Sequence, residues 1–284
     1  MKLASLKHGR DGQLIVVSRG LDIYVSAQEI VPTLQEALDD WGKYQPLLQA
    51  LSDDLAKGKR SDSRELDVHG LAAPLPRTYE FLDGSAYLPH VERVRRARGA
   101  EVPESFYVDP LMYQGTSAGF LGPCDPVVAV SEEHGIDFES EVIVVTGDVS
   151  MAASPEEAAA QIKLIGLIND VSLRNLIPGE LAKGFGFLQS KPRSALSPVL
   201  VTPDELGDAW RDSVLHLPLH SYLNGEWFGS PDAGTDMQFN FGQLVAHAAR
   251  TRPLAAGTIV GSGTIANQDT ELGASCLAEK RMLE

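Results

Sequence analysis

The stretch Gly135–Val145 reads GIDFESEVIVV, in which two glutamates lead directly into an apolar run. The run, bounded by turn residues, predicts a buried strand over 140–148. Because side chains alternate along a strand, Glu139 and Glu141 project from the same face, about 6.5–7 Å apart at Cα. Two like charges this close to a core repel each other unless a cation lies between them. For an isolated pair, a solvated face is the more common arrangement.

A third carboxylate, Asp170, ends another apolar stretch, Ile165–Asn169. We expect Asp170 to be partly buried, where an unpaired charge is costly. The alternative is a helix N-cap, because Asn-Asp precedes Ser-Leu-Arg. Three carboxylates without a Cys/His cluster would form a hard-oxygen site, suited to Mg²⁺, Ca²⁺ or Mn²⁺ rather than Zn²⁺.

Composition excludes several classes of function. The chain has 284 residues and a formal net charge of -15, with 43% hydrophobic residues, as in a soluble globular protein. This acid excess repels phosphate backbones and acidic membrane surfaces, so we expect neither nucleic-acid nor membrane partners. No apolar run has a membrane-spanning length. Two cysteines, Cys124 and Cys276, fit a reducing cytoplasm.

The order of patterns indicates an α+β fold that is mainly β. Short strands and two helical patterns precede Pro74-Leu75-Pro76, where we place a boundary between a small N-terminal α+β domain (1–75) and a larger domain (76–284). The remainder has strand-like runs at 127–133, 140–148, 197–203, 214–230 and 257–264. Asn224-Gly225 predicts a hairpin, and Ser154-Pro155-Glu156-Glu157 begins a helix to about Leu164. A β-roll or barrel with peripheral helices fits best.

Four motifs occur in a fixed order: Glu139-Ser140-Glu141, Asn169-Asp170-Val171-Ser172-Leu173-Arg174, Gln189-Ser190-Lys191, and Gly261-Ser262-Gly263-Thr264-Ile265. This arrangement resembles the fumarylacetoacetate hydrolase family from about Phe81 to Glu279. The resemblance implies that Glu139, Glu141 and Asp170 hold a divalent cation, with Mg²⁺ first and Ca²⁺ or Mn²⁺ as alternatives. Asp83, seven residues before His90, matches an extra ligand of the fumarylacetoacetase branch.

The resemblance also implies catalytic and substrate-binding residues. His90 maps to the catalytic histidine, and either Glu92 or Glu279 would orient it. Lys191 and Arg174 would stabilise an oxyanion or hold a substrate carboxylate. The substrate contacts would come from Tyr87, Tyr113 and Thr264. His90 alone would more often be a surface or capping residue.

The hydrolases of this family cleave a carbon–carbon bond in a β-diketo acid, so the resemblance implies an enzyme of aromatic-compound catabolism acting on a substrate such as fumarylacetoacetate or fumarylpyruvate. The alternatives are an isomerase, hydratase or oxaloacetate decarboxylase of the same fold, and a catalytically silent protein that binds small acids. The expected partners are a small dicarboxylic or diketo acid and a second copy of the chain in a homodimer. Family members continue past the segment matching Ala278-Glu279-Lys280, so the domain here is expected to be shortened or to close differently.

A basic run follows His90 and comprises Arg93, Arg95, Arg96 and Arg98. Such a run is usually a solvated face. In an acidic protein it could instead draw an acidic substrate toward the site, which is our hypothesis for it.

Overall fold

The computed structural model describes residues 1–284 except 98 and 100. Within these residues, eleven strands form one sheet in the order β4-β3-β2-β1-β12-β9-β8-β17-β5-β6, with β11 paired to β9. The strands of this sheet are β1 (Lys2–Leu6), β2 (Gln13–Val17), β3 (Ile23–Ser26), β4 (Arg64–Glu65), β5 (Phe81–Gly84), β6 (Met112–Gln114), β8 (Ser140–Thr146), β9 (Ile162–Asn169), β11 (Ala195–Leu196), β12 (Leu200–Val201) and β17 (Ile259–Gly261). The sheet is mixed, because β17 runs parallel to β5 and antiparallel to β8.

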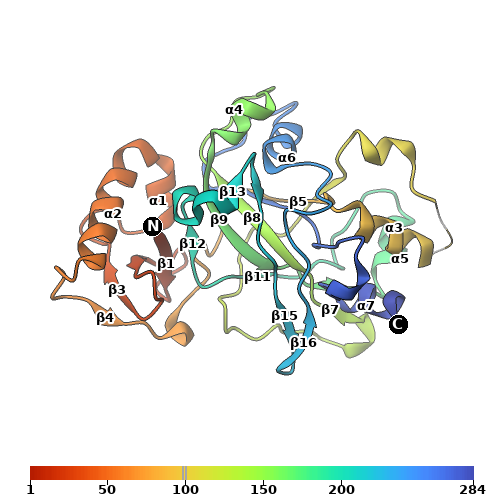
Figure 1. The fold of residues 1–284 in the computed structure, drawn as a ribbon, viewed down its shortest axis with the longest axis horizontal. Helices are drawn as coiled ribbons and strands as arrows, with labels where there is room; N and C mark the ends of the chain where they lie inside the picture. The colour runs from red at the N-terminus through yellow and green to blue at the C-terminus, as the bar shows by residue number, and fades with distance from the viewer. Residues whose placement is uncertain (98, 100) are drawn as a thin grey trace.

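Helices and smaller strand pairs surround the sheet (Figure 1). The α-helices are α1 (Leu34–Asp39), α2 (Trp41–Ala56), α3 (Leu88–Ala97), α4 (Pro155–Ala159), α5 (Ile177–Leu181), α6 (Phe241–Ala248) and α7 (Leu277–Leu283). The strand pairs are β7 (Ile136–Asp137) with β10 (Ser172–Leu173), β13 (Trp210–Arg211) with β14 (Val214–Leu215), and β15 (Ser221–Leu223) with β16 (Glu226–Gly229). Short 3₁₀ helices span Val68–Gly70, Glu104–Tyr107, Glu132–His134, Pro203–Ala209 and Thr270–Leu272. The fold is therefore α+β, as the sequence predicts.

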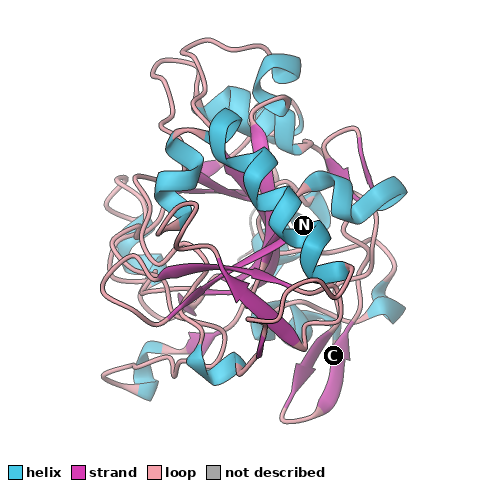
Figure 2. Cartoon of the chain, turned by 90° about the vertical axis from the view of Figure 1, so that its left-hand side faces the viewer, coloured by secondary structure: helices cyan, strands magenta, loops and turns pink. Residues whose placement is uncertain are grey.

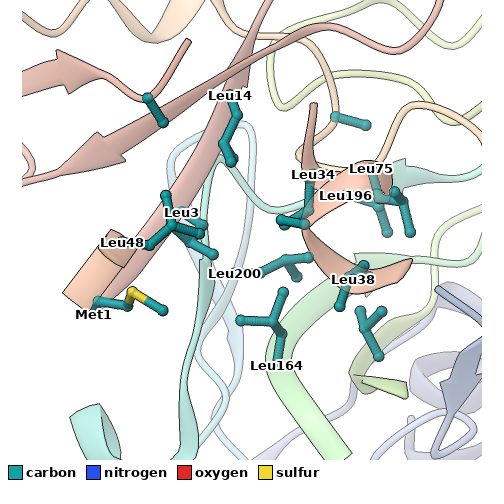
Figure 3. Close-up of a cluster of buried hydrophobic side chains, with 14 of the residues drawn as sticks. Met1, Leu3, Leu14, Leu34, Leu38, Leu48, Leu75, Leu164, Leu196 and Leu200 are labelled. Atoms are coloured by element: carbon teal, nitrogen blue, oxygen red, sulfur yellow. The ribbon is translucent and has the colours of Figure 1, made fainter. Parts of the chain in front are cut away.

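The N-terminal residues form a small α+β unit, which faces the viewer in Figure 2. Thr33 is the N-cap of helix α1, and its side chain accepts a hydrogen bond from the Glu36 amide. Strand β1 of this unit pairs with β12 of the rest of the chain. A shared core crosses the same junction, where Leu3 and Leu48 pack in one cluster with Leu164 (Figure 3). The division near residue 75 stays a prediction, because sheet and core cross it without a break.

Strand β8 lies at the centre of the larger part and is buried on both faces. Ile143 and Val145 belong to the cluster shared with the N-terminal unit, whereas Val142 and Val144 pack in a second cluster on the opposite face. A continuous apolar run is what a strand covered on both faces requires. Glu141 has the same parity as Ile143 and Val145, so at this end of β8 an otherwise apolar face becomes acidic.

The predicted hairpin at Asn224-Gly225 is confirmed. Strands β15 and β16 flank these two residues, and both have positive φ, 54° at Asn224 and 85° at Gly225. Two successive left-handed residues form the turn that matches the twist of paired strands, and asparagine and glycine tolerate that conformation best.

Two secondary-structure predictions are wrong. Residues 127–133 are not a strand: Val128 and Val130 are 83% and 91% exposed, and no strand pairs with them in the described part of the chain. Their β-branched side chains favour an extended backbone, but a strand also needs a partner for its hydrogen bonds. The helix starting at Pro155 ends at Ala159 instead of Leu164, because Ile162 already pairs with β8. None of the described helices combines the length and apolar character that crossing a membrane requires.

Candidate active site and metal centre

A cavity of about 390 Å³ lies where β5, β8 and β17 meet α3. Its lining includes Asp83 and Glu141 from the sheet, Glu139 from the residue just before β8, and His90 from α3. Apolar residues from α3, β6 and α5 form much of the remaining wall, including Val94, Met112 and Leu181. The cavity therefore presents acidic and titratable groups within an otherwise largely apolar wall.

Three buried acids form what we call the carboxylate cluster: Asp83, Glu141 and Asp170. Each offers an oxygen, and these oxygens all lie within 4.8 Å of one another. The three residues are at most 5% exposed. They lie on or next to three strands that are close together in the sheet: Asp83 on β5, Glu141 on β8, and Asp170 just after β9. Strand β8 pairs directly with β9, and only β17 lies between β8 and β5. Asp170 follows β9 and precedes β10, so it is no helix N-cap.

The groups around the carboxylate cluster fit a divalent cation. Asp83 Oδ1 accepts a hydrogen bond from the Gly263 amide at 3.1 Å, and Asp170 Oδ1 accepts one from Ser194 Oγ at 2.7 Å. Both oxygens of Glu141, in contrast, are buried without a hydrogen-bond partner among the described residues. Gly261 leaves the space open, since a Cβ there would overlap the Asp83 carboxylate and touch Glu141. An oxygen-only donor set with an unpartnered buried carboxylate suits Mg²⁺, Ca²⁺ or Mn²⁺.

Glu139 lies next to the carboxylate cluster but contacts two cationic side chains. Its Oε1 accepts from Arg174 at 2.7 Å, and its Oε2 accepts from Lys191 at 2.6 Å. Lys191 Nζ also lies 2.5 Å from Asp170 Oδ2. Among the four acids that the sequence proposes as ligands, the structure thus gathers Asp83 with Glu141 and Asp170, and it places Glu139 against Arg174 and Lys191.

The pKa values of these acids differ according to their surroundings. Burial and the neighbouring Asp170 charge raise the pKa of Asp83 to about 8. Burial and the charge of Asp83 likewise raise the pKa of Glu141 well above its ordinary value. Burial alone would raise the pKa of Glu139 too, but the charges of Lys191 and Arg174 outweigh it and hold that pKa below the ordinary range. Glu139 is therefore ionised at neutral pH, whereas Asp83 and Glu141 need added positive charge to ionise.

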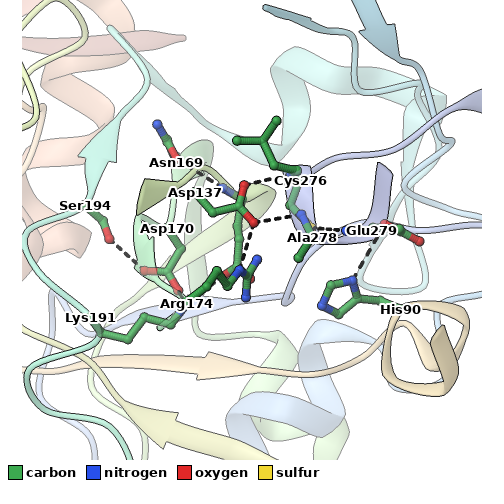
Figure 4. A network of polar contacts seen from close by, with 12 residues as sticks. His90, Asp137, Asn169, Asp170, Arg174, Lys191, Ser194, Cys276, Ala278 and Glu279 are labelled. Carbon is green, nitrogen blue, oxygen red and sulfur yellow. Dashed lines mark hydrogen bonds and ion pairs between the residues drawn. The ribbon is translucent and has the colours of Figure 1, made fainter. Parts of the chain in front are cut away.

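Asp137 links the acidic end of the cavity to α7 and is a residue that the sequence analysis missed. Its carboxylate accepts from Arg174 Nε at 2.8 Å and from the amides of Leu277 and Ala278 at 2.7 and 3.0 Å (Figure 4). A carboxylate at a helix N-terminus is favourable, and here it fixes the start of α7. The signal was present, because Asp137 stands two residues before Glu139 and continues the alternation of acids.

Helices α3 and α7 pack together and bring His90 to Glu279. His90 Nδ1 lies 3.6 Å from Glu279 Oε2, and Arg93 donates to Glu279 Oε1 at 2.5 Å. The other proposed partner, Glu92, accepts from Tyr107 and Gln268 instead. This follows from helix geometry, since residues two apart do not share a face whereas His90 and Arg93 do. We call His90 and Glu279 the dyad.

The three proposed substrate contacts all line the cavity. Tyr113 donates its hydroxyl proton to Asp170 Oδ2, and Tyr87 donates to the Ala233 carbonyl at 2.7 Å. Thr264 is 4% exposed and follows the glycine that binds Asp83. Both tyrosines are thus already hydrogen-bonded within the protein.

Glu180 on α5 is a second residue that the sequence analysis missed. Its carboxylate accepts from the amides of Leu188, Gln189 and Ser190 and from Ser190 Oγ, just before Lys191. Burial would raise its pKa, but these hydrogen bonds lower it to about 2. Glu180 therefore fixes the loop that carries Lys191, a role that sequence spacing does not reveal.

The basic run after His90 does not form one surface. Arg93 binds Glu279, and Arg95 lines the cavity with its guanidinium 4.4 Å from the centre of the Phe106 ring. Arg96 is exposed, and Arg98 lies outside the described residues. Among the arginines of this run that the structure describes, Arg95 is thus the one placed to meet a molecule in the cavity.

We expect Mg²⁺ to stabilise the protein more at high pH than at low pH. A carboxyl whose pKa is raised on folding stabilises the fold below its unfolded pKa and loses this contribution as pH rises toward the folded value. For Asp83 that loss extends from about pH 4 to about 8, so the free energy of unfolding of the metal-free protein falls over this range. Saturating Mg²⁺ should restore about 3 kcal/mol near pH 8 and less near pH 5.5. Thermal unfolding with Mg²⁺ or with a chelator measures this.

The control for this experiment is Glu141→Gln, which keeps the size of the unpartnered side chain but removes its charge. It should show little or no Mg²⁺-dependent shift at either pH. An equal shift in both proteins, or undiminished Mg²⁺ binding by Glu141→Gln in isothermal titration, would show that the cation binds elsewhere.

Known proteins resemble the chain over both of its parts. The family model described as Fumarylacetoacetate (FAA) hydrolase C-terminal matches residues 80–283, and that described as Fumarylacetoacetase N-terminal domain 2 matches residues 1–77. The 2,4-didehydro-3-deoxy-L-rhamnonate hydrolase of Sphingomonas sp. (strain SKA58) is 30% identical over 159 residues, covering 55% of this chain and 53% of that protein. The chain spans about half the length of the curated relatives it matches.

Solved structures share the fold. Fumarylacetoacetate hydrolase from Exiguobacterium antarcticum has a TM-score of 0.68 at 20% identity, covering 94% of this chain and 87% of that one. Maleylpyruvate hydrolase from Sphingobium sp. SYK-6, in complex with manganese (II) ion and pyruvate, has a TM-score of 0.66 at 16% identity, covering 97% and 90%. At these identities the likeness concerns the fold alone. Since the first family model matches most of its length, the chain belongs to the fumarylacetoacetate hydrolase family.

Proposed function

We propose that the protein is a metal-dependent hydrolase that cleaves a carbon–carbon bond in a β-diketo acid such as fumarylacetoacetate or fumarylpyruvate. The observation that carries this proposal is the arrangement of two different groups around one cavity. The carboxylate cluster, with its unpartnered Glu141, is suited to a cation, and the dyad has a histidine backed by a buried carboxylate. Such a cavity can polarise a diketo acid and activate water beside it.

The cation would be held by the carboxylate cluster, with Mg²⁺ as the first candidate. When bound, it would supply the positive charge that stabilises the enolate character of the leaving fragment. Its charge would offset the burial and the neighbouring negative charges that raise the pKa values of Asp83 and Glu141, so both carboxyls would ionise. Lys191 and Arg174, which hold Glu139 ionised, would keep the floor of the cavity close to neutral and would attract a substrate carboxylate.

The dyad would take the proton of the attacking water. With Nδ1 facing Glu279, the Nε2 atom of His90 is left to accept that proton, and the buried carboxylate stabilises the imidazolium that results. Arg93 keeps one oxygen of Glu279 fixed and leaves the other to His90. The present separation of 3.6 Å must shorten by a few tenths of an ångström to form a hydrogen bond.

The direct test is to incubate the protein with Mg²⁺ and either fumarylpyruvate or fumarylacetoacetate and to follow the loss of the enol absorbance. We expect turnover that stops on addition of a chelator. Oxaloacetate serves as the comparison substrate. Activity on oxaloacetate with none on either diketo acid would refute the hydrolase and favour a decarboxylase or tautomerase. Binding of the acids without any turnover would favour a catalytically silent protein.

Arg95 should contribute to substrate capture in a way that Arg96 does not. Arg95 lines the cavity and is positioned over Phe106, whereas Arg96 is exposed. Arg95→Ala should raise KM about tenfold with little change in kcat, as loss of a charged hydrogen bond to a substrate carboxylate predicts. Arg96→Ala should change KM less than about twofold. Steady-state kinetics of both variants over a series of salt concentrations would measure the two effects on KM. Equal effects would mean that the basic run after His90 attracts the substrate only through its overall charge.

A further inference from the structure

A second group of potential metal ligands lies outside the carboxylate cluster. His90, Cys276 and Glu279 each offer one ligand atom, and these three atoms lie within 4.8 Å of one another. His90 is on α3, while Cys276 caps the N-terminus of α7 and Glu279 lies in its first turn. Because 186 residues separate His90 from Cys276, sequence spacing gives no sign of this Cys/His pair.

Two atoms of this group are buried without hydrogen-bond partners among the described residues: His90 Nδ1 and Glu279 Oε2. Glu279 is fully buried, and Arg93 occupies its Oε1, so Oε2 is the oxygen left to face His90. The separation of 3.6 Å between Nδ1 and Oε2 exceeds an ordinary hydrogen bond. It is close to the spacing of about 3.3–3.5 Å that two ligands have on a tetrahedral ion with bonds of 2.0–2.2 Å.

The donor types of the two groups differ. Thiolate, imidazole and carboxylate together suit Zn²⁺, whereas a set of carboxylates alone suits Mg²⁺. Of the three residues, His90 is the one that lines the cavity, so an ion would enter the site beside its ring. We propose that His90, Cys276 and Glu279 form a zinc site, distinct from the carboxylate cluster, through which Zn²⁺ inhibits the enzyme.

The inhibition part rests on the proposed function, because the ion would occupy both members of the dyad. With Nδ1 and Oε2 bound to zinc, Glu279 could no longer orient His90 or stabilise its protonated form. Burial raises the pKa of the Cys276 thiol, so the metal-free thiol is protonated. Formation of the Zn–S bond therefore releases one proton to solvent, and no oxidant or reductant is involved.

Cobalt replaces zinc as the probe, because a Co²⁺–thiolate bond gives a charge-transfer absorbance that carboxylate ligands do not give. Chelator-treated protein, first saturated with Mg²⁺, is titrated with Co²⁺ and then with Zn²⁺. We expect one equivalent of Co²⁺ to produce the thiolate band and Zn²⁺ to remove it. This measurement is independent of turnover, so it tests the site even if the protein hydrolyses no diketo acid.

Two matched variants identify the sulfur. Cys276→Ser keeps a good N-cap for α7, and it should lack the band and show at least tenfold weaker zinc inhibition relative to its own activity. Cys124→Ser removes the exposed thiol and should retain both properties. Absence of the band in the unaltered protein, or its persistence in Cys276→Ser, would overturn the site. A normal band with zinc inhibition unchanged in Cys276→Ser would overturn the inhibitory role.

Discussion

Replacement of His90 by Gln is expected to lower kcat for a diketo acid about 100- to 10,000-fold, the usual contribution of a general base. Glutamine retains hydrogen-bonding groups near Glu279 but cannot accept a proton from water at neutral pH. The Mg²⁺ affinity should not change, because His90 is not part of the carboxylate cluster. Steady-state kinetics with isothermal titration of Mg²⁺ on the same preparation would separate the two effects.

Two further variants make this prediction specific. Glu279→Gln removes the buried charge that faces His90, and we expect a loss of kcat of comparable size. Glu92→Gln is the matched control, since Glu92 contacts Tyr107 and Gln268 instead of the histidine. If His90→Gln kept more than about a tenth of the activity, or if Glu92→Gln were the more damaging change, the dyad would be assigned incorrectly.

Two residues of the carboxylate cluster, Glu141 and Asp170, could be predicted because their signal is local, whereas Asp83 was proposed from the family resemblance. Glu141 belongs to a strand whose alternation and apolar continuation are visible in eleven consecutive residues, and Asp170 directly follows the strand that pairs with it. Burial of a charge in such a run is costly, so a buried carboxylate there needs a positive partner, either a side chain or a metal ion. The order of the motifs along the chain, which resembles that of the family, indicated that the strands carrying these acids lie close together in the fold.

The contacts of Glu139 and Glu279 could not be predicted in the same way. Glu139 belongs to the same alternation as Glu141, but its partners are Arg174 and Lys191, which lie 35 and 52 residues later. Likewise, the choice between Glu92 and Glu279 depends on the packing of α3 against α7, about 190 residues apart. Long-range packing of this kind is a property of the assembled sheet and helices, whereas alternation is a property of one strand.

A run of apolar residues also gave a wrong strand prediction where no partner strand is present among the residues that the structure describes. Residues 127–130 have three valines, yet Val128 and Val130 face solvent. In contrast, the helical pattern after Pro155 ends early, because pairing of Ile162 with β8 outweighs the local propensity for helix. Both differences show that strand formation is decided by whether a partner strand is present.

The second large effect is expected from replacement of Lys191, whose positive charge lies beside the carboxylate cluster. Lys191 is 8% exposed, and its ammonium group contacts both Glu139 and Asp170. Burial alone would lower the pKa of Lys191, but Asp170 and Glu139 raise it above its ordinary value, so the side chain is charged at neutral pH. Lys191 thus supplies positive charge to Glu139 and also to Asp170, which belongs to the carboxylate cluster.

Lys191→Met should destabilise the metal-free protein by about 3–5 kcal/mol, because it removes one partner of a buried ion-pair network and leaves carboxylates uncompensated. Mg²⁺ should recover part of this loss and should bind more tightly than to the unaltered protein, since a positive charge next to the cluster is gone. Urea unfolding with a chelator and with Mg²⁺, together with isothermal titration of Mg²⁺, measures both effects.

Lys183→Met is the matched control, because Lys183 is exposed and its replacement should change the free energy of unfolding by less than about 0.5 kcal/mol. The direction of the change in Mg²⁺ affinity separates two roles of Lys191. If Lys191 serves mainly as a counter-charge, stability falls while Mg²⁺ affinity rises. If it instead holds Asp170 in place for the cation, Lys191→Met loses both stability and Mg²⁺ affinity. An unchanged unfolding midpoint in the presence of chelator would contradict both roles, because a buried ammonium group between two carboxylates cannot be removed without a free-energy cost.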